Sequence, residues 1–245
     1  SLKLDPNGEN FPFSIKTEKK VGARDIMTIF RDTYEDTPFD MTKFMLVPET
    51  DKEGKRTGKF IKSPYANPFM DYDMMPLFKI NGGWNELGER CIARYYCTYV
   101  TVIQVRNWLP PDIGGLVWFG HDNPAMTAYS PIYIGAKTVP ESYRICGRPG
   151  FNRACAWWAF NRVADLSAQK WGVMRQDVSA VWKPFEASAF NQQQDFETRV
   201  LKLYKINPRK ARKLLTQYST DWMNKLVNAY WKLGDDLWSK YTGKF

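Results

Sequence analysis

The chain has 245 residues, of which 44% are hydrophobic and 16% aromatic, and it carries a formal net charge of +9. This apolar content excludes a disordered chain, and the length allows one large domain or two small ones. No run of about 18 apolar residues occurs, so we expect no membrane span. Basic residues are widely spread, and the one dense group, residues 209–213, opens an amphipathic helix. We interpret that group as solvated surface and expect no nucleic-acid partner.

The first third of the chain predicts one helix between irregular segments. Apolar residues recur at helical spacing from Gly22 to near Tyr34, where residues 37–42 break the pattern with a proline. Residues 48–76 are rich in Pro, Gly, Lys and Asp and have no clear period. We therefore expect a long surface excursion over that range.

The middle of the chain predicts an antiparallel meander over residues 78–134. Asn81-Gly82-Gly83 is a strong hairpin signal. Residues 90–106 are dense in β-branched and aromatic side chains, which predicts one long strand. Two further strands are expected over residues 115–120 and 128–134.

The C-terminal part predicts helices. In the last of them Asn207 is expected to cap the N-terminus, and Pro208 occupies the first helical position. Strands followed by helices indicate an α+β chain. We predict an α+β unit over residues 1–150 and a helical region over residues 151–245 that packs on it.

Four cysteines are present. Cys91 and Cys97 fall in the predicted strand 90–106, about 20 Å apart. A disulfide requires Cα atoms within about 7 Å, so this pair is expected to stay reduced and to pack as small apolar side chains. Cys146 and Cys155 flank a Gly- and Pro-containing turn and could close a loop. The disulfide state of that second pair stays open.

The common catalytic and metal-binding patterns are missing from the sequence. With one histidine, His121, and no tight cysteine pair, we expect no metal site and no cofactor. No nucleophile elbow, phosphate-binding loop or dinucleotide fingerprint occurs. His121 beside Asp122 is compatible with a general base, but a turn is the preferred interpretation. Ser1 precedes a polar, turn-rich stretch and is interpreted as a chain boundary, not as a nucleophile.

Several segments together resemble the dipeptidases of peptidase family C69 (U34). They occur in the family's order and cover nearly the whole chain. They are Tyr34–Thr42, Gln104–Arg106 with Trp108–Pro110, Gly114–Gly120, Tyr129–Tyr133, Val139–Tyr143 and Leu214–Ser219.

The resemblance implies an N-terminal-nucleophile hydrolase with an αββα sandwich that cleaves dipeptides. In that family the nucleophile is a cysteine at the mature N-terminus, upstream of the segments matched here. The resemblance therefore implies that this chain is the C-terminal part of a longer polypeptide, contains no catalytic residue and is inactive alone. It also implies secretion or a periplasmic location.

Within this chain we expect contacts with the substrate or the oxyanion from Arg90, Arg94, Arg106 and Asn123, because a dipeptide has charged termini that need recognition. For each arginine the competing interpretation is an exposed or structurally paired strand residue. The expected partners are a dipeptide, the upstream part of the polypeptide and, because a cut sheet exposes an edge, further copies of this chain. Two alternatives are a non-catalytic relative that binds peptides or cell-wall fragments, and a basic binding module.

Overall fold

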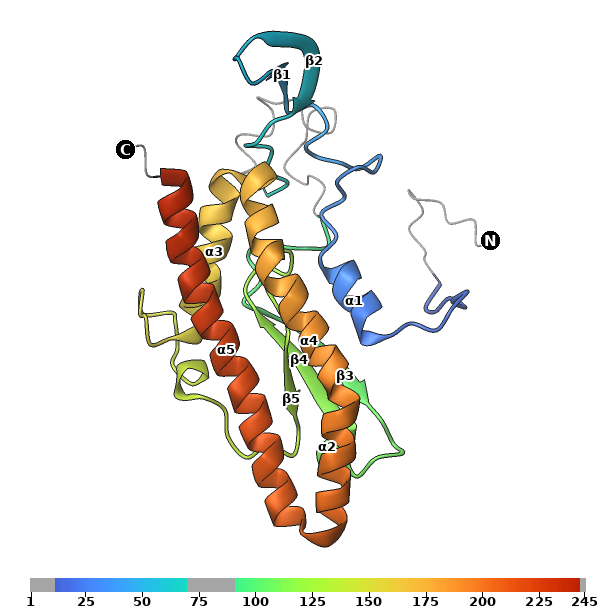
Figure 1. The fold of residues 1–245 in the computed structure, drawn as a ribbon. Coiled ribbons are helices and arrows are strands. Elements are labelled where there is room, and N and C mark those ends of the chain that lie inside the picture. Colours follow the sequence, from blue (N-terminus) through green and yellow to red (C-terminus); the bar gives the residue numbers. More distant parts are fainter. Residues whose placement is uncertain (1–11, 70–90, 243–245) are drawn as a thin grey trace.

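The computed structural model describes residues 12–69 and 91–242 and shows a mixed α+β protein (Figure 1). The N-terminal half contains the helices α1 and α2 and the strands β1 to β5, and the C-terminal half contains three longer helices. The elements are α1 Ala23–Phe30, β1 Leu46–Thr50, β2 Arg56–Lys62, β3 Tyr99–Val105, α2 Pro111–Gly114, β4 Gly115–His121, β5 Ser130–Tyr133, the 3-10 turn η3 Glu141–Tyr143, α3 Ala156–Gln169, α4 Trp171–Ile206 and α5 Pro208–Thr242.

The central sheet has three antiparallel strands in the order β3-β4-β5. Along β4, Leu116 and Trp118 are fully buried and alternate with partly exposed residues, so one face of the sheet is covered. Trp118 stacks on Phe190 of α4, with ring centroids 4.0 Å apart, and the backbone N–H of Tyr133 in β5 donates to Ser219 of α5. The predicted antiparallel sheet with a helical C-terminal portion is thus confirmed.

The predicted strand over residues 90–106 is wrong in its first half. The strand β3 starts at Tyr99, and Cys91 and Cys97 both lie before it. The backbone N–H of Ala93 donates to Asp32 O at 3.0 Å, and Cys91 and Ala93 are buried in a core shared with the helices. Tertiary contacts therefore override the strand propensity of this segment. All four cysteines are free.

The expected irregular excursion over residues 48–76 is also wrong over its first part, because β1 and β2 form an antiparallel hairpin that projects from the molecule (Figure 1). Its turn is built by Asp51, whose carboxylate accepts the N–H groups of Glu53 and Lys55, and by Gly54 with φ 81°. A positive φ suits glycine because it has no Cβ. The hairpin signal at residues 81–83 lies outside the described residues, as does Ser1.

The helices α4 and α5 form a long antiparallel pair, and α3 packs beside α5 (Figure 1). The predicted start of the last helix is confirmed: Asn207 Oδ1 accepts the N–H of Lys210 at 3.0 Å, and Pro208 is the first helical residue. Within the described residues no helix has both the length and the apolar character for a membrane crossing. The predicted division at residue 150 stays a prediction.

Candidate functional site

A pocket of about 590 Å³ lies between α4 and the stretch formed by α1 and residues 31–35. We call it the α1–α4 pocket. Its volume is within the usual range for small-molecule sites. Apolar and charged side chains share its walls: Arg24, Met27, Thr28, Ile29, Arg31, Asp32, Thr33, Glu35, Trp182, Lys183, Glu186, Ala187 and Phe190.

A buried ion pair joins the two sides of the pocket. Arg31 Nη2 lies 2.5 Å from Glu186 Oε1, and both side chains are nearly inaccessible to solvent. Arg31 also donates to the carbonyl of Thr127, and Glu186 Oε1 accepts the backbone N–H of Tyr129. These bonds connect the end of α1, the middle of α4 and the segment before β5, so the back of the pocket is rigid.

Aromatic rings enclose the guanidinium of Arg31. Its Cζ lies 3.9 Å from the ring centroid of Trp182 and 4.8 Å from that of Tyr129. Burial raises the pKa of Glu186, while the charge of Arg31 and the hydrogen bonds to the carboxylate oppose that rise. Arg31 Nη2 and Glu186 Oε1 are used in contacts inside the protein, so we interpret the pair as structural; Arg31 Nε is buried without a hydrogen-bond partner among the described residues.

The rim of the pocket carries charges without ion-pair partners in the described part of the chain. Arg24 lies over the ring of Phe190 at 4.4 Å and Lys183 over that of Trp182 at 5.7 Å, and neither forms an ion pair there. The carboxylate of Asp32 forms none either within the described residues, and it accepts the backbone N–H of Tyr34. Two cations and one carboxylate are therefore available to a ligand that carries both charges.

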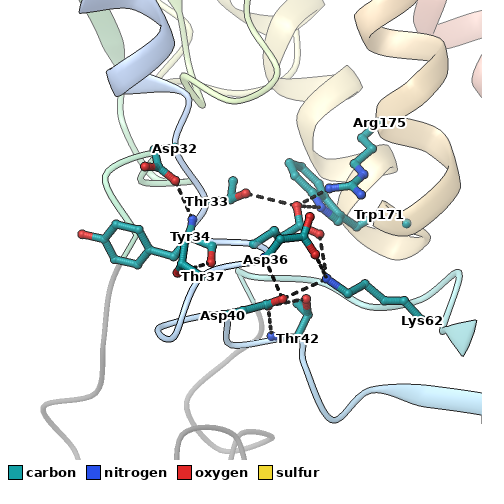
Figure 2. A network of polar contacts seen from close by, with 12 residues as sticks. Asp32, Thr33, Tyr34, Asp36, Thr37, Asp40, Thr42, Lys62, Trp171 and Arg175 are labelled. Atoms are coloured by element: carbon teal, nitrogen blue, oxygen red, sulfur yellow. Dashed lines mark hydrogen bonds and ion pairs between the residues drawn. The ribbon is translucent and has the colours of Figure 1, made fainter.

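The segment that carries the resemblance, residues 34–42, forms a polar network beside this pocket (Figure 2). Asp40 accepts hydrogen bonds from the N–H and hydroxyl of Thr42, from the N–H of Asp36, and from Lys62 at 2.9 Å. Burial opposes ionisation of Asp40, but these hydrogen bonds outweigh it and lower the pKa of its carboxyl to about 2. Asp40 is thus a permanently charged anchor for the turn.

Glu35 links this network to α4 and to the pocket. Its Oε2 accepts hydrogen bonds from Arg175, from the indole of Trp171 and from the hydroxyl of Thr33. Lys62 lies 3.6 Å from its other carboxylate oxygen. The polar network therefore holds the loop after α1 against the start of α4. This contact fixes the position of Asp32 at the rim of the pocket.

The predicted site residue Arg106 makes its contacts with other residues of the protein interior. Its guanidinium donates to Glu197 at 2.5 Å and to the carbonyls of Ile113 and Gly114. Glu197 also accepts the hydroxyl of Tyr133. These contacts tie β3 and β5 to α4, away from the α1–α4 pocket.

Among the described residues, Arg94, Arg106 and Asn123 do not line the α1–α4 pocket. Arg90 lies outside the described residues. Arg94 hydrogen-bonds the hydroxyl of Tyr96 and lies over its ring. Asn123 is buried in the loop after β4, where its Oδ1 accepts the N–H of Ala125 at 2.9 Å. Its amide N–H groups have no hydrogen bond within the described residues.

His121 ends β4 and packs among the rings of Phe119, Tyr143 and Phe160. Burial lowers its pKa to about 4. Asp122 adopts φ 63°, so the polar loop turns in the left-handed region. His121 is thus the last residue of a strand, paired with Tyr99, and the turn begins at Asp122.

Cys91, Cys97 and Cys155 are not built as nucleophiles. Burial raises the pKa of Cys91 to about 12, and its thiol donates to the carbonyl of Ala93. Burial also raises the pKa of Cys97, and the buried Cys155 donates to the carbonyl of Ile145. A reactive cysteine needs a lowered pKa and an electropositive surrounding. Among residues 12–69 and 91–242, no group of three His, Cys, Asp or Glu side chains could hold a metal ion.

Together these features describe a protein with a small pocket suited to a ligand that carries both charges. The family model of peptidase family C69 matches residues 1–184, which includes the network around Asp40 and the pocket up to Lys183. No curated protein matches the chain. The chain belongs to peptidase family C69, a family of cysteine peptidases, as its sequence resemblance predicts.

The sequence analysis missed the residues that line the pocket. Arg31 and Asp32 immediately precede the segment 34–42 that carries the resemblance, and this adjacency was an available signal. Lys183 and Glu186 lie in α4 with no local motif. Only the packing of α1 against α4 shows that they belong to one site.

Proposed function

We propose that this chain is part of a cysteine dipeptidase that hydrolyses dipeptides by N-terminal-nucleophile acyl transfer, and that the nucleophilic cysteine lies upstream of residue 1. The family match over residues 1–184 carries this proposal. Cys91 and Cys97 support the upstream nucleophile, because burial raises the pKa of both thiols. Export from the cytoplasm, expected from the resemblance, is part of the same proposal.

The proposed chemistry needs a thiolate and a base. The free α-amine of the upstream cysteine takes the thiol proton, and sulfur attacks the carbonyl carbon of the peptide bond. The carbon–nitrogen bond then breaks as the amine returns the proton to the leaving group. Water hydrolyses the acyl-enzyme and releases the second product. Asn123, whose amide N–H groups have no hydrogen bond among the described residues, stays our candidate donor to the oxyanion, and Arg94 stays a candidate substrate contact; neither residue lines the α1–α4 pocket.

We place the substrate in the α1–α4 pocket. The two charged termini of an extended dipeptide lie about 7 Å apart, so both must be recognised within one small cavity. Arg24 and Lys183 are the proposed partners of the substrate carboxylate, and Asp32 is the proposed partner of its ammonium group. Phe190 and Trp182 offer apolar surface to the side chains.

The first test compares dipeptide hydrolysis by the parent polypeptide and by this 245-residue chain. Cleavage by the parent alone is the expected result. If neither cleaves a panel of dipeptides, the non-catalytic peptide-binding alternative replaces the enzyme. If this chain cleaves alone, an internal cysteine or Ser1 must be the nucleophile and the upstream assignment is wrong.

The second test locates the substrate in the parent polypeptide. Removing both cations with Arg24→Ala and Lys183→Ala should raise KM about tenfold for a free dipeptide and much less for its C-terminal amide. Asp32→Asn, which keeps the acceptor for Tyr34, should affect free dipeptides more than N-acetylated ones. Lys202→Ala on the exposed face of α4 is the control. If the variants still distinguish free dipeptides from amidated and acetylated ones as the wild type does, the substrate does not bind in the α1–α4 pocket. The proposed dipeptidase activity would not be affected by that result.

A further inference from the structure

A second cavity, of about 490 Å³, lies between α5 and the segment after β5. We call it the basic cavity. Its lining contains four cationic side chains and no acidic one. The α5 residues among them recur at spacings of three and four, so they share one face of the helix. The lining is Lys137, Thr138, Arg209, Arg212, Lys213, Thr216, Gln217 and Thr220.

Hydrogen bonds fix the walls of the basic cavity. The backbone N–H of Lys137 donates to Thr216 Oγ1 at 3.0 Å, which holds the segment after β5 on α5. Arg212 Nε donates to Asp112 Oδ2 at 2.8 Å and is thereby oriented. These two bonds preorganise the backbone on both sides of the cavity and the side chain of Arg212.

The donors that line the basic cavity are largely unused. Lys137, Arg209 and Lys213 form no ion pair within residues 12–69 and 91–242. Arg212 contacts Asp112 through Nε alone and keeps its terminal N–H groups. The hydroxyl of Thr220 is buried without a hydrogen-bond partner in the described part of the chain. A buried, unpaired hydroxyl is costly unless a ligand or water completes its hydrogen bonds.

The position of these cations opposes the stability of the helix. Arg209, Lys210, Arg212 and Lys213 lie in the first six residues of α5, and its first turn has no acidic residue. The helix dipole is positive at this end, so Arg209 and Lys210 in the first turn lie where an acidic residue would stabilise the helix. Such a local conflict between sequence and fold is typical of functional sites. Of these four, Lys210 alone does not line the cavity; Arg209, Lys210 and Lys213 are exposed, as predicted for a solvated surface, and Arg212 is partly buried.

We propose that the basic cavity binds a small, soluble ligand bearing more than one phosphate group. A single carboxylate would leave most of the cavity's positive charge unpaired, whereas phosphate groups carry up to two charges each and several acceptor oxygens. Arginine and lysine at the start of a helix are the groups that bind such anions. The α5 wall, residues 209–220, lies beyond the residues matched by the family model, so the site is separate from the peptidase pocket.

Titration calorimetry with tripolyphosphate tests this proposal. The double variant Arg209→Ala/Lys213→Ala should weaken binding by about tenfold or more, since two charge-assisted contacts are lost. The control Lys202→Ala/Lys205→Ala removes the same charge from the exposed end of α4 and should change the affinity less than about twofold. Removing cations from a helix N-terminus should not lower the Tm, so loss of binding in a folded variant is interpretable.

Three results would overturn the proposal. The first is no binding of tripolyphosphate to the wild-type protein. The second is an equal loss in the control variant, which would show attraction to the general positive surface. The third is equally tight binding of citrate, which would remove the preference for phosphate. Dipeptide hydrolysis is not a readout in this experiment, so failure of the peptidase proposal does not affect it.

Discussion

Arg31 and Glu186 lie 155 positions apart in the sequence, and their side chains form a buried ion pair at 2.5 Å. The pair joins α1 to α4, and Glu186 also accepts a hydrogen bond from the backbone N–H of Tyr129. It positions the pocket in which we place the substrate. The contribution of this ion pair to the free energy of unfolding can be measured with variants.

Removing one member of this pair should destabilise the protein strongly. Glu186→Ala leaves the guanidinium of Arg31 buried without its counter-ion, and we expect a loss of about 3–5 kcal/mol in the free energy of unfolding. The double variant Arg31→Met/Glu186→Met should recover a large part of that loss. Lys232→Ala, which breaks the exposed pair with Asp236, should cost less than about 1 kcal/mol. Urea denaturation compares the four proteins, and equal losses at both pairs would contradict the structural role.

Acid stability should depend on Asp40. Its pKa is lowered from 3.8 to about 2 in the folded state, so the ionised carboxylate contributes stability above about pH 4. That contribution, about 2 kcal/mol, is lost as the pH falls through 2, because the unfolded chain takes up the proton first. Unfolding free energies between pH 5 and pH 2 should therefore fall less in Asp40→Asn than in the wild type. Parallel curves for the two proteins would refute the assignment.

The single histidine offers a clean titration. Burial lowers the pKa of His121 from 6.5 to about 4, so the folded imidazole should stay neutral at pH 5. Between pH 6.5 and 4 the unfolded state binds a proton that the folded state does not, so His121 lowers stability as the pH falls. Asp122 acts in the opposite direction, since burial raises its pKa to about 7. NMR of the imidazole Cε1–H reports His121 alone, and a midpoint near 6.5 would contradict its burial.

The face of the central sheet that points away from α4 and α5 should mediate self-association. On β3, Ile103 is 66% and Val105 81% exposed, and β3 is also an edge strand. Exposed apolar faces and strand edges favour association. Ile103→Lys should lower the mass measured by light scattering at high concentration. The matched control Ile206→Lys changes an equally exposed residue at the end of α4. A wild-type chain that stays monomeric would disprove this expectation.

Local sequence patterns determined those elements whose signals lie within a few residues. The start of α5 follows from Asn207 and Pro208, and the strand predicted over residues 115–120 is observed as β4, Gly115–His121. Family membership also follows from the sequence, because it depends on short ordered segments such as residues 34–42. In these cases the information that predicts the element or the family lies in neighbouring residues, as a helix cap, a hydrophobic period or a short motif.

The tertiary structure determined those features that depend on contacts between residues far apart in the sequence. Residues 91–97 have strand-like composition, but Ala93 bonds to Asp32 and the segment packs in the core, so the strand starts later. Arg106 is predicted to contact substrate, yet a carboxylate 91 positions away, on Glu197, pairs with it. Whether a charged side chain is paired or free is set by burial and by which groups approach within a few ångströms. Neither property has a local signature, and for that reason the pocket and the basic cavity appear only in the folded molecule.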